Sequence, residues 1–102
     1  MKRPVHWARP ALDDLKELVA FIARENPAAA VRVADRIRDT CIALGEMAIG
    51  RPGRVTGTYE KPVTGLSYII SYELRQIAGQ ESVVILRVIH GARDWREGQW
   101  PQ

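Results

Sequence analysis

The fold is decided by residues 82–95, which read S-V-V-I-L-R-V-I-H-G-A-R-D-W. The first part is a run of branched apolar residues in which both alternating faces are apolar, with Val84, Leu86 and Val88 on one and Val83, Ile85 and Ile89 on the other. Such a strand is normally central in a sheet and covered on both faces. From His90 onward the stretch is polar, and functional groups often lie where a rigid strand gives way to a loop. We therefore expect the functional end of the molecule here.

The sequence upstream predicts a short strand and two helices. Residues 4–7 are apolar enough for an opening strand, and Pro10 suits the first turn of a helix. This first helix has an apolar stripe of Leu12, Leu15, Val19 and Ile22, widened by Leu18. Its acidic residues Asp13, Asp14 and Glu17 lie near the N-terminus, where the helix dipole favours negative charge. Asn26-Pro27 ends it, because the residue before proline avoids the helical region. The second helix buries Ala30, Ala34, Ile37, Cys41 and Leu44, so the two should form an antiparallel hairpin.

The second half of the chain predicts strands. Gly50–Arg54 is a turn cluster, and residues 55–61 have strand character despite Gly57. The next strand alternates strongly, with Leu66, Tyr68, Ile70, Tyr72 and Leu74 on one face. The order β-α-α-β-β-β predicts an α+β fold, a helical hairpin packed on one face of a small, largely antiparallel sheet. At this length we expect residues 1–102 to form one domain.

The charge balance and the few cysteines and histidines make several classes of function less suitable for this chain. The net charge of +3 permits an anionic partner, but it is too small for a dedicated nucleic-acid binder. We expect no sequence-specific DNA binding. A single cysteine, Cys41, excludes an intrachain disulfide and favours a buried structural thiol, and two histidines are too few for a convincing zinc site. The sequence predicts no metal, no cofactor and no membrane segment, and hence a cytoplasmic protein.

The residues that could carry chemistry gather around His90. No phosphate-binding loop, dinucleotide fingerprint, metalloprotease or serine-hydrolase motif occurs. His90 with Arg87 and Arg93 could serve as acid/base and phosphate clamp for RNA cleavage. The spacing alone favours the simpler interpretation, in which His90 caps the strand end by a hydrogen bond to a loop carbonyl. The tryptophans Trp95 and Trp100 could pin the tail to the body or anchor a partner.

Three motifs together resemble the RelE/ParE toxin superfamily: G-R-P-G-R-V-T-G-T-Y-E at residues 50–60, Y-I-I-S-Y at 68–72 and I-L-R-V-I-H-G-A-R-D-W at 85–95. The likeness spans nearly the whole chain, because the opening strand and helical hairpin also match that fold in order and length. It implies the toxin of a bacterial type II toxin–antitoxin pair, neutralised by a cognate antitoxin and associated with plasmid stabilisation.

Two activities compete within this superfamily. RelE-like members cut mRNA in the ribosome and carry an arginine three residues before the tyrosine of the third strand, where this chain has Ile69. Y-I-I-S-Y and H-G-A-R-D instead resemble the ParE branch, which poisons DNA gyrase and for which no catalytic residues are established. The resemblance therefore favours a gyrase inhibitor, with a ribosome-dependent mRNA endonuclease using His90, Arg87 and Arg93 as the alternative. Tyr59 departs from the pattern, because relatives often carry arginine there.

We expect separate surfaces for the two protein partners. Helix 1 has a wider apolar stripe than one seam needs, so Leu15, Leu18 and Ile22 are candidate antitoxin-binding residues for a partner helix. Arg51 and Arg54 would meet acidic residues of the antitoxin in a hetero-oligomer. The tail residues Arg93, Arg96 and Trp100 are candidates for the surface presented to gyrase.

Overall fold

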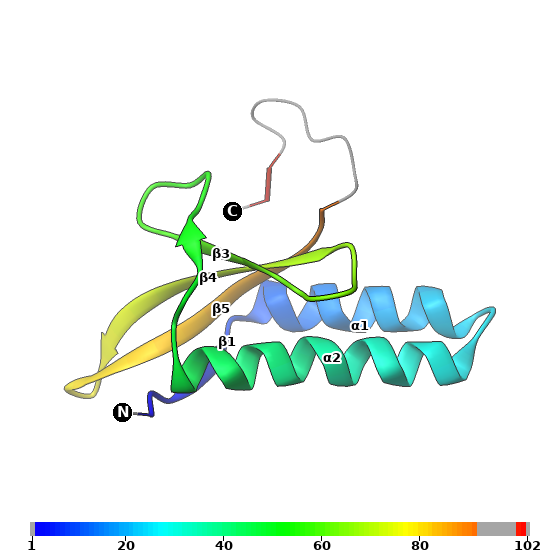
Figure 1. The fold of residues 1–102 in the computed structure, drawn as a ribbon, viewed down its shortest axis with the longest axis horizontal. Coiled ribbons are helices and arrows are strands. Elements are labelled where there is room, and N and C mark those ends of the chain that lie inside the picture. Colours follow the sequence, from blue (N-terminus) through cyan, green and yellow to red (C-terminus); the bar gives the residue numbers. More distant parts are fainter. Residues whose placement is uncertain (1, 92–99, 102) are drawn as a thin grey trace.

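A helical hairpin covers one face of a five-stranded sheet (Figure 1). The computed structural model describes residues 2–91 and 100–101. Its elements are β1 (Val5–Trp7), α1 (Arg9–Ala23), α2 (Pro27–Glu46), β2 (Arg51–Pro52), β3 (Tyr59–Pro62), β4 (Tyr68–Ile77) and β5 (Gln80–His90). The sheet order is β1-β5-β4-β3-β2; β1 runs parallel to β5 and every other pair is antiparallel. The predicted α+β class is confirmed.

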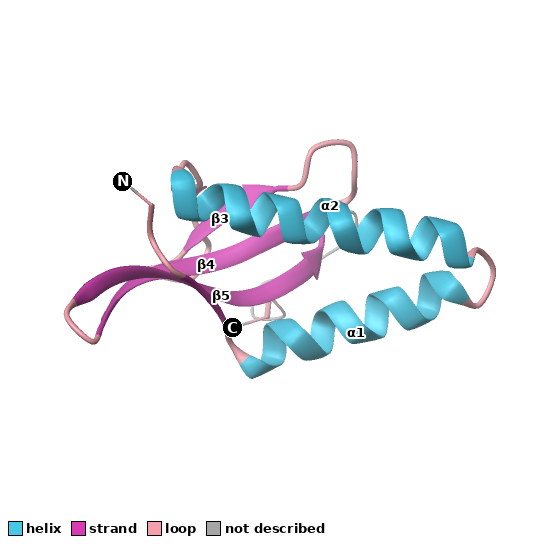
Figure 2. Ribbon diagram, turned by 90° about the horizontal axis from the view of Figure 1, so that it is seen from below, coloured by secondary structure: helices cyan, strands magenta, loops and turns pink. Residues whose placement is uncertain are grey.

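The hairpin forms where the sequence predicts it, with α1 and α2 side by side under the sheet (Figure 2). Pro10 lies in the first turn of α1. The Asn26 side chain caps α2 by accepting a hydrogen bond of 3.0 Å from the Ala29 N–H, and Pro27 follows it as the first helical residue. An asparagine cap satisfies one of the backbone donors that a helix start leaves unpaired. This short junction fixes the antiparallel arrangement.

The predicted core faces hold for α2 and need correction for α1. All five predicted positions of α2 are buried. In α1, the buried residues are Ala11 and Leu15, whereas Leu12 is 38% exposed, so the core face is rotated from the predicted stripe. The first turn of α1 has no acidic residue, so the predicted dipole role of Asp13, Asp14 and Glu17 does not hold, because that effect fades beyond one turn.

The strand predicted over residues 55–61 begins later, at Tyr59. Residues 53–58 form a loop instead, since Gly53 N–H donates to the Thr58 carbonyl at 2.9 Å and Thr58 N–H donates to the Val55 carbonyl at 3.1 Å. These local bonds satisfy backbone groups that a strand would pair. The predicted turn cluster contains the two-residue strand β2, which pairs with Tyr59 and Glu60 of β3.

A β-bulge changes which side chains of β5 face the helices. Ser71 pairs with Arg87 and Tyr72 pairs with Ile85, which leaves Leu86 as the extra residue. Val83, Ile85 and Val88 therefore join the core between the sheet and the helices. The predicted grouping of Val88 with Val84 and Leu86 is wrong, because the bulge turns Val88 to the opposite face. Val84 and Ile89 are also buried, as expected of a strand covered on both faces. The middle strand of the sheet is nevertheless β4.

The core joins α2 to β4 and β5. Tyr72 is 1% exposed, stacks on Tyr59 with ring centroids 5.5 Å apart, and accepts a hydrogen bond of 2.8 Å at its hydroxyl from Gly50 N–H. Cys41 is buried in the same core, and burial raises the pKa of its thiol to about 12. The thiol therefore stays protonated at neutral pH, in line with the predicted structural role.

Candidate functional site

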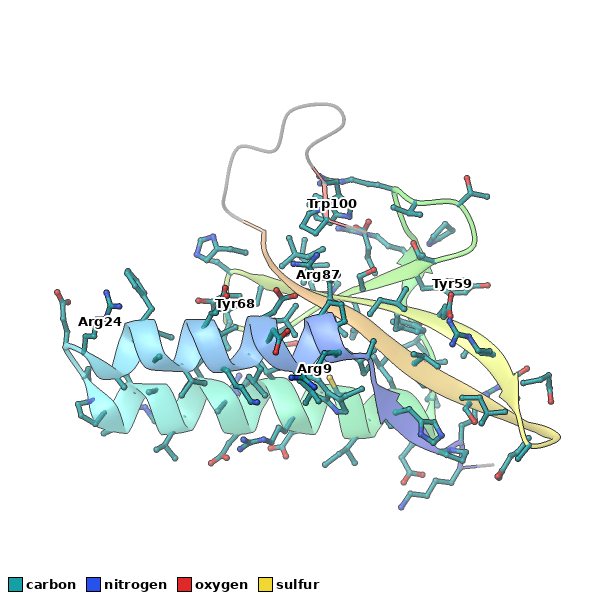
Figure 3. The ribbon with its side chains drawn as sticks, turned by 180° about the vertical axis from the view of Figure 1, so that it is seen from behind. Arg9, Arg24, Tyr59, Tyr68, Arg87 and Trp100 are labelled. Carbon is teal, nitrogen blue, oxygen red and sulfur yellow. The ribbon has the colours of Figure 1, made fainter. Side chains whose placement is uncertain are left out.

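An open groove of about 730 Å³ lies between α1 and the C-terminal half of β5. It exists because β1 is short: β1 ends at Trp7, which pairs with Ile85, and α1 takes over the edge of the sheet from there. Leu18, Phe21 and Ile22 line one wall, and Tyr68, Val88 and His90 line the opposite one. Figure 3 shows Tyr68 and Arg87 along α1. Pro101 also reaches this groove.

Asp14 closes the inner end of the groove by binding two groups of β5. The Arg87 guanidinium donates two hydrogen bonds of 2.8 Å to it, from Nε to Oδ2 and from Nη2 to Oδ1. The Val88 N–H, which faces the edge that β1 has left, donates to Oδ2 at 2.9 Å. The hydrogen bonding of its guanidinium to the Asp14 carboxylate raises the pKa of Arg87. This carboxylate thus replaces a missing neighbouring strand and immobilises Arg87.

The outer end of the groove is aromatic and apolar. Phe21 is 70% exposed on α1, which is unusual for a phenylalanine. Across from it, Tyr68 meets His90 edge to face, with ring centroids 5.1 Å apart, and burial raises the pKa of the Tyr68 hydroxyl. This end of the groove is therefore suited to apolar partner side chains.

The predicted antitoxin-binding residues fall into three environments. Leu15 is 7% exposed and belongs to the core, so its side chain offers little surface to a partner. Leu18 and Ile22 line the groove. Arg51 and Arg54 lie elsewhere, in β2 and the β2–β3 loop, which stands on the side of the sheet away from the helices (Figure 1).

Residues 100–101 connect these two regions. The Arg54 guanidinium carbon lies 3.7 Å from the centroid of the Trp100 ring, and the neighbouring Pro101 lines the groove. Trp100 is half-buried beside the β2–β3 loop (Figure 3). The other predicted target-binding residues, Arg93 and Arg96, lie outside the described residues, as does Trp95.

Of the three residues of the ribonuclease alternative, His90, Arg87 and Arg93, the structure describes the first two, and these two have different partners. Arg87 is held by Asp14, His90 is an exposed residue packed on Tyr68, and Arg93 lies outside the described residues. The position where ribonuclease relatives carry arginine, Ile69, pairs with Ile89. Within residues 2–91 and 100–101, no group of three or more potential metal ligands occurs, and no helix has the length and apolarity to span a bilayer.

Sequence reasoning missed two residues of the groove, Asp14 and Phe21. Phe21 could have been found, because it lies off the apolar stripe of α1 and a large aromatic residue on a polar face suggests a binding role. Asp14 gave no such signal, since its partners lie far away in the sequence.

The chain matches known proteins along nearly its whole length. The family described as "ParE toxin of type II toxin-antitoxin system, parDE" matches residues 5–95. The toxin candidate Y4kP of Sinorhizobium fredii is 37% identical over 102 residues, which cover 99% of this chain and 96% of that protein.

Three solved structures share the fold at low identity. A chain of the chromosomal ParDE system from P. aeruginosa superposes with a TM-score of 0.78 at 19% identity, over 87% of this chain and 96% of that one. A chain of the RelBE2 toxin–antitoxin complex from Mycobacterium tuberculosis gives 0.61 at 22% identity, over 88% and 99%. A YoeB/ParE toxin from Agrobacterium tumefaciens gives 0.57 at 13%, over 83% and 94%. On the family match and the identity to Y4kP, the chain belongs to the ParE toxins of type II toxin–antitoxin systems.

Proposed function

We propose that this toxin inhibits DNA gyrase in the cytoplasm and is neutralised by a cognate antitoxin. Membership of the ParE family carries the proposal. Two of the sequence motifs, Y-I-I-S-Y and H-G-A-R-D, resemble the branch of the superfamily that poisons gyrase. The toxin then acts as a binding protein, and its surface rather than a catalytic group determines its effect.

The Asp14–Arg87 pair supports this function over RNA cleavage. A phosphate clamp needs a cation whose donors can reach the phosphate, but two donors of Arg87 already bind Asp14. The pair is partly shielded from solvent, since 27% of the Arg87 side chain and 14% of the Asp14 side chain are exposed. Releasing Arg87 would therefore leave the Asp14 carboxylate poorly solvated. The paired Ile69 and Ile89 supply no replacement cation.

The groove is the proposed antitoxin site. Leu18, Phe21 and Ile22 give α1 an apolar face that an amphipathic helix of the partner can cover. Asp14 already binds the outer edge of β5 at Val88, so a helix of the partner rather than an added strand is the proposed binding mode. The solved complex of a fold relative, RelBE2, contains both toxin and antitoxin, which supports a hetero-oligomer.

The proposal is tested by offering the purified toxin both targets. We expect it to inhibit supercoiling of relaxed plasmid by gyrase and to leave mRNA on translating ribosomes uncut. Arg38→Met serves as a control that should inhibit equally, because Arg38 lies on α2, is not among the residues that line the groove, and pairs at the surface with Asp35. Site-specific cleavage of ribosome-bound mRNA that disappears in His90→Ala would replace the gyrase function by the ribonuclease one.

A further inference from the structure

Glu60 is a buried carboxylate that holds the β2–β3 loop from below. It is 3% exposed, and both of its oxygens are engaged. Oε2 accepts a hydrogen bond of 2.8 Å from the Arg54 backbone N–H, and Oε1 lies 3.7 Å from Nη2 of Arg51. A carboxylate is costly to bury unless it is paired and hydrogen-bonded, so this arrangement restricts the loop to conformations that keep both contacts.

The loop is also closed on itself around Arg54. Gly53 N–H donates to the Thr58 carbonyl, and the Thr58 hydroxyl donates to the Val55 carbonyl at 2.6 Å. A Cβ at position 53 would lie 2.4 Å from the Thr58 hydroxyl oxygen, so only glycine fits there. The backbone of Arg54 is therefore fixed on both sides, although the residue itself is exposed.

The fixed Arg54 presents its guanidinium to Trp100. The distance of 3.7 Å from the guanidinium carbon to the ring centroid is that of a stacked cation–π pair. A planar guanidinium lying on an indole restrains both the position and the tilt of the ring. The contact joins the β2–β3 loop to Trp100. Residues 100–101 take part in none of the strand pairs of the sheet, and this side-chain contact links them to the loop.

We propose that Arg54, held by Glu60, is a positioning residue for Trp100 on the target-binding surface. The inference takes from the sequence the expectation that Trp100 belongs to that surface, and it rests on the proposed function in treating the toxin as a binding protein. It gives Arg54 an intramolecular role in place of the direct antitoxin contact expected from the sequence. The loop pre-orients the indole, so less conformational freedom is lost when the target binds.

The test combines one spectroscopic and one functional measurement on the full chain. The indole N–H resonance of Trp100 is identified by its absence in Trp100→Phe. Arg54→Met keeps the length and the apolar stem but removes the guanidinium, and it should shift that resonance. It should also raise the toxin concentration needed for growth arrest about fivefold, the factor equivalent to a contact of about 1 kcal/mol. Arg54→Lys should restore part of the activity.

Two controls separate this inference from the proposed function. Arg38→Met, the same substitution at another exposed arginine, should change neither the resonance nor growth arrest. The double variant of Arg54→Met and Trp100→Phe should be no weaker than Trp100→Phe alone, because both changes remove one shared contribution. Growth arrest is measured without antitoxin and does not depend on which target is inhibited.

Three results would overturn the inference. An unmoved resonance in Arg54→Met shows that the contact does not hold the ring in solution. A moved resonance with full toxicity, while Trp100→Phe is weakened, removes the positioning role and leaves the target surface intact. Full toxicity of Trp100→Phe removes Trp100 from that surface and the inference with it. Failure of gyrase inhibition in the separate supercoiling assay would affect the proposed target alone.

Discussion

Asp14 does for the sheet edge what a longer β1 would otherwise do. Its carboxylate accepts three hydrogen bonds, two from the Arg87 guanidinium and one from the Val88 backbone. No side-chain nitrogen or oxygen in the described part of the chain is buried without a hydrogen-bond partner. Removing the carboxylate would leave a partly shielded cation and a backbone donor without their acceptor.

We therefore expect Asp14→Ala to destabilise the fold by about 1–3 kcal/mol. Asp13→Ala provides a matched control, because Asp13 forms a surface pair with Arg9 at 3.5 Å and its loss should cost at most about 0.5 kcal/mol. Urea denaturation of the two variants measures both values. Equal free energies of unfolding would show that the Asp14 contacts contribute little in solution.

Individual residues were predictable where the signal is local. The buried positions of α2, including Ile37 and Cys41, follow from helical periodicity, which depends only on neighbours along the chain. The pairing of Asp14 with Arg87 follows from the topology of the sheet, and no spacing within either segment indicates it. The same holds for Arg54 and Trp100, which appeared in the sequence as parts of two different surfaces.

At the scale of elements, α1 has two apolar faces with different tasks. Ala11 and Leu15 face the sheet, whereas Phe21 faces the groove beside Leu18 and Ile22. A surface helix of a globular protein usually has one apolar face, which packs on the core, and a polar face toward solvent. The exposure of 70% at Phe21 therefore indicates a surface kept for a partner.

Phe21→Ser should weaken antitoxin binding at least about tenfold, because an aromatic side chain that a partner can bury is a typical anchor of a protein interface. Its thermal stability should stay near that of the unchanged toxin, since little buried contact is lost. Val31→Ser is the matched control: Val31 is 61% exposed, lies on α2, and does not line the groove. Titration calorimetry with the antitoxin measures both affinities. Equal affinities would place the antitoxin on another face.

The elements themselves were predicted more reliably than their junctions. Both helices and the long strands β4 and β5 have patterns of many residues, and they are present as predicted. The bulge at Leu86 has no sequence signal, because a run of apolar residues looks the same with or without a register shift. The late start of β3 arises from hydrogen bonds between Gly53, Val55 and Thr58, which the strand-like composition concealed.

At the scale of the whole molecule, a net charge of +3 favours approach of an acidic partner without determining where it binds. Arg51 is the better candidate for such an approach, because 60% of its side chain is exposed although it lies near Glu60. Arg54 is already stacked on Trp100. Charge reversal at Arg51 would place two carboxylates together, so neutralisation is the cleaner change.

Arg51→Gln should slow antitoxin association a few-fold at low ionic strength and leave dissociation nearly unchanged, because exposed charges act mainly on the encounter. At high salt the variant and the original toxin should associate at equal rates, since salt screens exposed charges over distances of about 10 Å or less. Arg38→Gln, which removes the same charge from α2, should slow association less at every salt concentration. Stopped-flow measurements across ionic strength, after the melting temperature confirms a folded variant, separate the outcomes. If the variant instead loses affinity at high salt through faster dissociation, Arg51 contacts the antitoxin directly in the complex and does not act only by attracting it at long range.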